Sequence, residues 1–446
     1  MKKINNKIKT LWGISEVGFS VMSTTETSFF VFFLTDVAQF PLALTGIITS
    51  FTAIADAITA VIAGIIIDKV TFKNGKYRPW LVYCSPFVTA FFVLMFTKIG
   101  SDTLACILVS IGYIMSHAIW NISWTANRNL IPVLTDSPDE RAFLSGRIAA
   151  GSCGGKMLAS WLVPTLNTLL IAAFSGITAY TLIALIAALL FMLCYCIHYS
   201  ITRGYEDDMH YESGKAVTFA DMAKSIAACP PLIAILLHDS LRLVAYYGVA
   251  ASASYYCKIA LQNPAAVKIL LLVFYFGGFL GSLLSKNAAA RLGGTKKASF
   301  FGVISFMVIH GICYFLPASL PLIAVMMGLS QFLFGIAYGL TSNLYAMCGT
   351  YSEYKTGKNT RGVIMAFCSL AIKLGVALRG LMITFVLTLI NYDPNGVITA
   401  ASQNGIKSLY ILAPAAVLLL SLIPLAFFKL DDKEVIRMEE EIKARA

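Results

Sequence analysis

Stretches of about 20 mainly apolar residues recur along the whole chain, and a helix needs about that length to cross a bilayer. Apolar residues make up 58% of the 446 residues and charged residues only 13%. A soluble domain needs about 25% charged residues to coat its surface. The sequence therefore predicts an all-α, multi-pass membrane protein, with spans at approximately 11–35, 41–68, 79–99, 104–133, 143–173, 176–202, 231–257, 266–290, 297–316, 319–348, 361–391 and 405–429.

The connections between these spans alternate in charge. Lysine and arginine gather at 69–78, 136–147, 291–297 and 355–361, whereas 36–42, 101–103, 175–178, 317–321 and 392–405 contain none. Basic residues mark the cytoplasmic side, so we expect both termini in the cytoplasm of a bacterial-type cell and the chain in its inner membrane. The net charge of +11 follows from this asymmetry and does not predict a nucleic-acid partner.

Six spans, a polar segment and six more spans indicate two repeated halves. We expect a bundle over 1–202, a cytoplasmic linker over 203–230, a second bundle over 231–429 and a tail over 430–446, either a solvated helix or disordered. A weak internal repeat supports this division, because glycine and basic residues follow both the second span (64–78) and the eighth span (281–297). Transporters built from two such halves hold their substrate near the midplane between them.

The loop after the second span resembles the cytoplasmic loop motif of the major facilitator superfamily. In that reading Asp68 and Arg78 are gating residues that form a charge latch between helices. The alternative is that these basic residues anchor the helix ends at lipid headgroups.

Motifs from the first to the eleventh span narrow the resemblance. They are WGISEVG (12–18), FLTDV (33–37), Asp56, NGKYRPW (74–80), Glu140–Arg141 with Arg147, YSEYK (351–355) and AIKLG (371–375). Together they resemble the melibiose-permease group, the glycoside–pentoside–hexuronide:cation symporters. The resemblance implies a twelve-helix major facilitator fold with two six-helix halves around a central cavity. It also implies sugar import coupled to a cation.

The resemblance places a cation-coupling site at Asp56, Thr59, Asn121 and Lys373. The family's second acid would fall at Ala60, one turn from Asp56, so this chain retains one acid of two. Sodium prefers several oxygen ligands. Sodium held at Asp56, proton coupling through Asp56, and uncoupled transport therefore all stay open.

The sugar-binding positions also depart from the family. Ser20 stands where the first-span acid is found, with Glu16 and Glu26 one to two turns away. On the fourth span, Asn121 is a hydrogen-bonding group flanked by two rings suited to stacking on a sugar. The candidate substrate-binding residues are Glu16, Ser20, Glu26, Trp120, Asn121, Trp124, Arg147 and Lys373; Arg147 is equally placed to anchor in headgroups.

Seven ionisable residues lie within apolar spans, where each costs about 2.5–3.5 kcal/mol and tends to face a cavity or a partner. Asp239 and Arg242 stand at i, i+3, so they are placed to form an ion pair on one helix face. Glu26 either binds substrate or pairs across the cavity with Lys156 or Arg379. The seven are Glu26, Asp56, Lys156, Asp239, Arg242, Lys373 and Arg379.

No nucleotide-binding loop, zinc-helix motif or nucleophile elbow is present, so we expect neither an enzyme nor a cofactor beyond a coupling H+ or Na+. The main hypothesis is a monomeric secondary transporter that imports a sugar, glycoside or related polar solute by cation symport. A facilitator or exporter of amphipathic compounds is the alternative, which a Trp-rich, acid-poor cavity would favour. A receptor or scaffold has no need of seven intramembrane charges.

Overall fold

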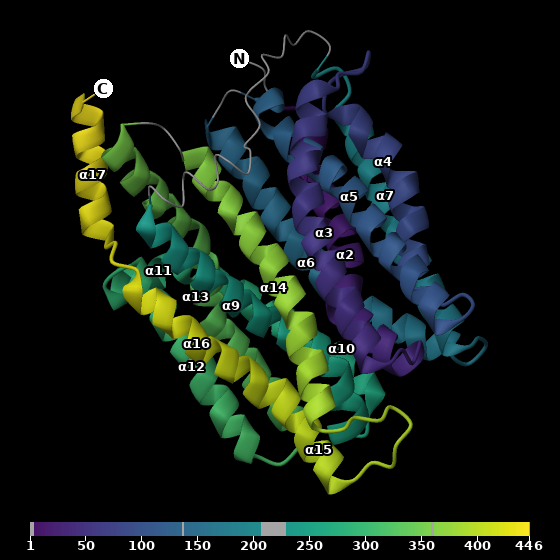
Figure 1. Cartoon of the computed structure of the whole chain (residues 1–446). Helices are drawn as coiled ribbons and strands as arrows, with labels where there is room; N and C mark the ends of the chain where they lie inside the picture. The colour runs from purple at the N-terminus through teal and green to yellow at the C-terminus, as the bar shows by residue number, and fades with distance from the viewer. Residues whose placement is uncertain (1–3, 136–137, 207–228, 358–360, 446) are drawn as a thin grey trace. The chain divides into compact units, whose positions relative to one another are not determined.

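The computed structural model describes residues 4–135, 138–206, 229–357 and 361–445. These residues are helical almost throughout and contain no β-strand, apart from one isolated bridge between Phe72 and Gly75. The chain divides into two compact units, Met1–Ala216 and Val217–Ala446, drawn in purple to blue and in teal to yellow in Figure 1. The all-α prediction is confirmed.

The described part of unit 1 contains six long helices that run up and down in an antiparallel bundle (Figure 1). A short α1 precedes the first of them, and a π-helical turn at Phe33–Val37 extends α2. The elements are α1 (Asn6–Leu11), α2 (Ile14–Phe32), α3 (Leu42–Lys69), α4 (Arg78–Met95), α5 (Asp102–Leu134), α6 (Pro138–Leu170) and α7 (Gly176–Ile201).

The described part of unit 2 also contains six spanning segments, with two short helices and a C-terminal helix added. Its elements are α9 (Pro230–Tyr255), α10 (Val267–Leu283), α11 (Ser285–Leu292), α12 (Thr295–Phe315), α13 (Leu320–Thr356), α14 (Arg361–Leu389), α15 (Ala400–Lys407), α16 (Ala413–Phe427) and α17 (Asp432–Arg445). π-Helical turns at Tyr256–Ala260 and Ser408–Leu412 extend α9 and join α15 to α16.

The two units share one internal packing scheme. In unit 1, α2 packs against α6 and α7, α3 packs against α5, and α4 packs against α5 and α7. In unit 2, α9 packs against α14 and α16, α10 against α13, and α12 against α13 and α16. Each helix of one unit therefore has a counterpart of the same rank in the other, which is the repeat that the sequence predicted.

Within the described residues, eleven helical segments are long and apolar enough to cross a bilayer. The fifth predicted span corresponds to α6, which is 33 residues long but less apolar because it carries charged and small residues. On α3, one side exposes large apolar side chains and the opposite side buries polar ones. The exposed side consists of Ile47, Phe51, Ile54, Ile58 and Ile62, and Thr52 and Asp56 lie on the buried side. This division is the one a lipid-facing helix requires.

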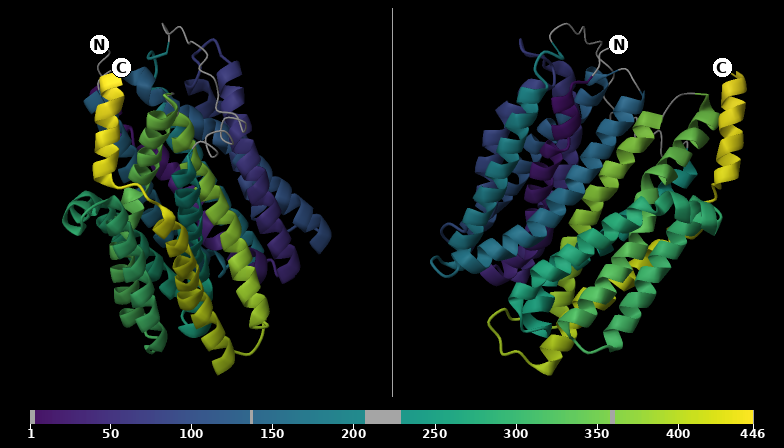
Figure 2. Two further views of the ribbon diagram at one scale, coloured as in Figure 1. Left: turned by 60° about the vertical axis from the view of Figure 1, so that its left-hand side comes forward. Right: turned by 180° about the vertical axis from the view of Figure 1, so that it is seen from behind.

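The tail is an ordered part of unit 2. Residues 432–445 form α17, which packs against the end of α13 beyond the spanning segments (Figure 2). Val435 and Met438 are buried in a cluster with residues of α9, α13 and α14. Asp432 accepts hydrogen bonds from the Thr295 backbone N–H (2.7 Å) and hydroxyl (2.6 Å). The alternative of a disordered tail is wrong, because the apolar side of this amphipathic helix is covered by the bundle.

The predicted linker (203–230) falls mostly at 207–228, outside the described residues.

Candidate functional site

Asp56 and Asn121 form a buried pair between α3 and α5. The Asn121 side-chain amide donates a hydrogen bond to Asp56 Oδ1 at 2.8 Å and lies 3.5 Å from the Thr59 hydroxyl. The Thr59 hydroxyl donates to the backbone carbonyl of Asp56 at 3.1 Å. Asp56 is 8% exposed, although it lies in a span whose other side faces lipid. The structure therefore brings together three of the four residues predicted for cation coupling.

The groups beside the Asp56 carboxylate include an amide and a hydroxyl. Asn121 turns its NH2 group toward the carboxylate, whereas sodium binds through several oxygen ligands. Within the described residues, no group of three or more His, Cys, Asp or Glu side chains is placed to hold a metal ion. A single hydrogen-bonded carboxylate is able to take up and release one proton.

Glu16 and Arg128 form a second charged pair, between α2 and α5. The Arg128 guanidinium donates to Glu16 Oε1 at 3.0 Å, and its central carbon lies 4.7 Å from the centre of the Trp124 ring. The Glu16 side chain is 5% exposed, whereas that of Arg128 is 37% exposed. Lys156 of α6 adds a second positive charge near the Glu16 carboxylate. The pair thus consists of a covered acid and a partly exposed base.

Sequence reasoning missed Arg128. It lies within the fourth predicted span, one turn after Trp124, and is a charged residue in an apolar stretch like the seven singled out above. The same rule that identified Asp56 and Lys373, an ionisable side chain inside a span, applies to it equally.

Aromatic and hydroxyl side chains surround the two pairs. Phe19 of α2 lies between Trp120 and Trp124, with ring centres 5.4 and 6.2 Å away. Ser20 donates to the Ser152 hydroxyl of α6 at 3.0 Å. Side-chain contacts therefore join Glu16 and Phe19 of α2 to α5, where Trp120 and Trp124 lie, and Ser20 of α2 to α6, while Asn121 of α5 faces α3.

Close approach of α2 and α6 depends on glycine. A Cβ atom on Gly151 would lie 2.2 Å from the Gly13 carbonyl oxygen, and one on Gly155 would lie 2.5 Å from the Val17 carbonyl oxygen. These glycines bring Lys156 and Ser152 of α6 next to the polar face of α2, which larger residues would push away.

Three of the residues predicted to bind substrate or couple the cation lie outside these two charged pairs. Glu26 is buried on α2, two to three turns beyond Glu16. Arg147 is exposed on α6 and lies over the Phe143 ring at 5.1 Å. Lys373 is half-buried on α14 of unit 2. Their predicted roles stay predictions.

The predicted gating residues lie at the loop between α3 and α4. The side chain of Asp68 is outside the described part of the structure. Arg78 is buried and ties this loop to α7, because it donates to the Thr202 hydroxyl at 3.2 Å and to the Tyr199 carbonyl at 2.9 Å. Glu206 accepts hydrogen bonds from the backbone N–H groups of Lys76, Tyr77 and Arg78 at 2.8–3.1 Å.

In unit 2, Asp239 and Arg242 form the predicted ion pair. Both side chains are 2% exposed, and the Arg242 Nε lies 3.0 Å from Asp239 Oδ1. The Tyr345 hydroxyl donates to the other carboxylate oxygen at 3.3 Å. Arg242 also lies over the Tyr338 ring at 5.0 Å.

Comparisons with known proteins give a consistent picture. Residues 11–432 match the family model described as MFS/sugar transport protein. The chain is 26% identical over 450 residues to a candidate 2,3-dihydroxypropane-1-sulfonate exporter of Salmonella typhimurium, covering 98% of this chain and 96% of the relative. It is also 26% identical to a candidate sulfoquinovose importer of Escherichia coli, covering 99% of this chain and 95% of the relative.

Solved structures show the same fold. The crystal structure of a mutant of the nucleoside transporter NupG aligns with a TM-score of 0.70 over 95% of this chain and 100% of that chain. At 13% identity this likeness bears on the fold alone. The six-plus-six arrangement of helices described above is therefore that of a known class of membrane transporters.

Proposed function

The chain belongs to the MFS/sugar transport protein family, and we propose that it carries a hydroxylated, sugar-related organic acid across the membrane in symport with a proton. It is a multi-pass membrane protein of a transporter family. The substrate's charge, the coupling ion and the direction of transport are the parts that we propose.

The Glu16–Arg128 pair is the observation that carries the substrate class. Arg128 is half-exposed beside Trp124, and its planar guanidinium matches a sulfonate or carboxylate through two parallel hydrogen bonds. An acidic substrate would displace Glu16 from Arg128, while the rings of Trp120 and Trp124 and the hydroxyl of Ser20 contact its polyol portion. One relative's name contains a dihydroxylated sulfonate, which agrees with this chemistry.

Asp56 is the proposed coupling residue. Its carboxylate is buried and accepts a hydrogen bond from Asn121, and taking up a proton removes a charge from an apolar span. In a coupled symporter, the change between the outward-open and inward-open states is favoured when substrate and proton are both bound or both absent. It is disfavoured when only one of them is bound. The tie between α3 and α5 through Asp56 and Asn121 joins the proton site to the helix that carries Arg128.

Uptake by proteoliposomes that contain the full chain tests the proposal. Matched solutes with and without an acid group separate the substrate classes: 2,3-dihydroxypropane-1-sulfonate against glycerol, and sulfoquinovose against glucose. We expect uptake of the acids and not of their neutral counterparts, with accumulation driven by an inward proton gradient and not by sodium. Transport of the neutral solutes at equal rates contradicts the substrate class.

The variant Asp56→Asn tests the coupling. It should abolish accumulation against a gradient while leaving exchange of substrate across the membrane intact. Asp102→Asn is the matched control, because Asp102 is an acid of unit 1 that lies in the first turn of α5 and pairs with Lys98. Unchanged accumulation in Asp56→Asn rules out the coupling role. The import direction is tested in the same vesicles, since one relative is described as an exporter and another as an importer.

A further inference from the structure

A pocket of about 810 Å³ lies in unit 2, where three spanning segments end beside α17. It is lined by the first two turns of α9, the last two turns of α13 and the end of α16, together with one side of α17. Because α9 begins at Pro230 and α16 ends at Phe427, the pocket lies at the level where the apolar spans give way to polar residues.

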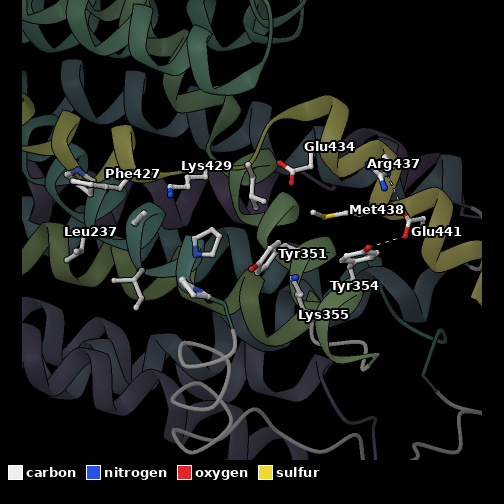
Figure 3. A pocket seen from close by; sticks show the side chains of 16 residues that line it. Leu237, Tyr351, Tyr354, Lys355, Phe427, Lys429, Glu434, Arg437, Met438 and Glu441 are labelled. Atoms are coloured by element: carbon white, nitrogen blue, oxygen red, sulfur yellow. Dashed lines mark hydrogen bonds and ion pairs between the residues drawn. The ribbon is translucent and has the colours of Figure 1, made fainter.

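The pocket is apolar at one end and polar at the other. Figure 3 shows Leu237 and Phe427 at one end and Tyr354, Arg437 and Glu441 at the opposite end, with Lys429 and Tyr351 between them. Leu237 is 53% exposed and Phe427 is 70% exposed, so the apolar end is open at the outer surface of the spans. Such side chains are stable there when acyl chains cover them.

Two lysines in the pocket are available to a ligand. Lys355 lies 5.9 Å from the ring of Tyr351 and is exposed, and Lys429 is exposed as well. Of the other charged side chains in the lining, Glu441 accepts hydrogen bonds from Arg437 and from the Tyr354 hydroxyl, both at 3.0 Å, and Glu434 of α17 is exposed. The two lysines therefore present positive charge toward the pocket from α13 and from the segment between α16 and α17.

The wall that carries the polar end is held firmly in place. The Thr350 hydroxyl donates to Glu439 at 3.2 Å, and the Tyr354 hydroxyl, one turn further along α13, donates to Glu441 at 3.0 Å. Val435 and Met438 are buried against the bundle, and Met438 also lines the pocket. The pocket is thus a built feature of unit 2 and not a gap beside a loose tail.

We infer that this pocket binds a glycerophospholipid, with its phosphodiester between Lys355 and Lys429 and an acyl chain along Leu237 and Phe427. A phosphate is the headgroup part that two lysines bind best, since each ammonium provides charge-assisted hydrogen bonds. The apolar end explains why the ligand is a lipid and not a soluble anion. The lipid would join α17 to α9 and α16 and stabilise the cytoplasmic end of unit 2.

Native mass spectrometry of the full-length protein in detergent, titrated with phosphatidylglycerol, tests the inference. We expect one tightly bound lipid in the wild type and at least about tenfold weaker binding of it in Lys355→Gln/Lys429→Gln, because two charge-assisted hydrogen-bond donors are lost. Lys286→Gln/Lys297→Gln is the matched control, since it removes two exposed lysines of unit 2 outside the pocket. An equal loss of binding in the control overturns the inference.

Two further ligands identify the source of the phosphate. Glycerol 3-phosphate, which lacks acyl chains, and diacylglycerol, which lacks phosphate, should each bind much more weakly than the phospholipid. If either binds as tightly, the inference is wrong. Lys355→Arg/Lys429→Arg should retain the lipid, which separates loss of charge from misfolding. None of these measurements depends on which solute the protein transports.

Discussion

Arg128 of α5 donates to Glu16 of α2 at 3.0 Å, so a charged pair joins two helices inside unit 1. The acid is covered and the base is partly open, with Trp124 stacked on the guanidinium. The Glu16 carboxylate occupies the guanidinium of Arg128, so an anionic solute would compete with Glu16 for this group. Exchange of partners on Arg128 is therefore the event that we expect substrate binding to involve.

Substitutions at the two partners should have opposite effects on affinity. Arg128→Gln removes a charge-assisted contact of about 1.5–3 kcal/mol, so binding of the acidic substrate should weaken about 10- to 150-fold. Glu16→Gln removes the competitor and should tighten binding severalfold. Arg128→Lys should be intermediate, because it keeps the charge but loses the planar fork.

Equilibrium binding of the sulfonate to purified variants measures this. A neutral solute of the same size is the control ligand, and its affinity should not follow the charge at position 128. If Glu16→Gln and Arg128→Gln weaken binding equally, the two residues act only in holding the helices together.

Ala60→Asp should convert the proposed proton site at Asp56 into one that also responds to sodium. Residue 60 stands one turn from Asp56, so a second carboxylate there would face the same space and supply the oxygen ligands that sodium requires. We expect sodium to raise the thermal unfolding temperature of Ala60→Asp and not of the wild type. Ala57→Asp is the control, because residue 57 lies on a different face of α3. Sodium stabilisation of the wild type would contradict the proton assignment.

Two glycines near the α3–α4 loop should respond in opposite ways to alanine. Gly75 has φ +116°, and a Cβ there would lie 2.4 Å from Glu206 Oε2. Gly75→Ala should therefore disturb the carboxylate that accepts three backbone N–H groups, with an expected loss of about 1–3 kcal/mol. Gly64 is helical, and a Cβ added to it would meet none of the described atoms within 4 Å. Gly64→Ala should therefore be neutral or stabilise the protein by up to about 1 kcal/mol.

Thermal unfolding of the two variants, with Glu206→Gln alongside, checks this. Glu206→Gln should resemble Gly75→Ala, since it removes the negative charge at the start of α4. Equal stability of Gly75→Ala and wild type would show that the loop does not depend on this cap.

The sequence predicted features that follow from periodicity, and missed those that depend on distant contacts. Apolar runs predicted the spans and the two halves, and the spacing of Asp239 and Arg242 predicted their pair. The contact of Asp56 with Asn121 was expected only through a family resemblance. Arg128 was overlooked although the rule of an ionisable side chain inside a span applies to it, whereas its pairing with Glu16, 112 residues away, is a contact that no local pattern indicates. The three N–H groups that bind Glu206 belong to a loop about 130 residues earlier, a contact that no local pattern indicates.

The Asp239–Arg242 pair offers a test of structural against functional roles in unit 2. Both side chains are buried, with Tyr345 of α13 bound to the acid, so removing either partner alone leaves an uncompensated charge. Asp239→Leu and Arg242→Met should each destabilise the protein by about 3–5 kcal/mol, whereas the double variant should recover most of the loss. We expect the double variant to transport as well, because the pair joins α9 to α13 and is covered on all sides. Thermal unfolding and uptake are measured on the same preparations. A double variant that is stable but inactive would show that this pair takes part in transport.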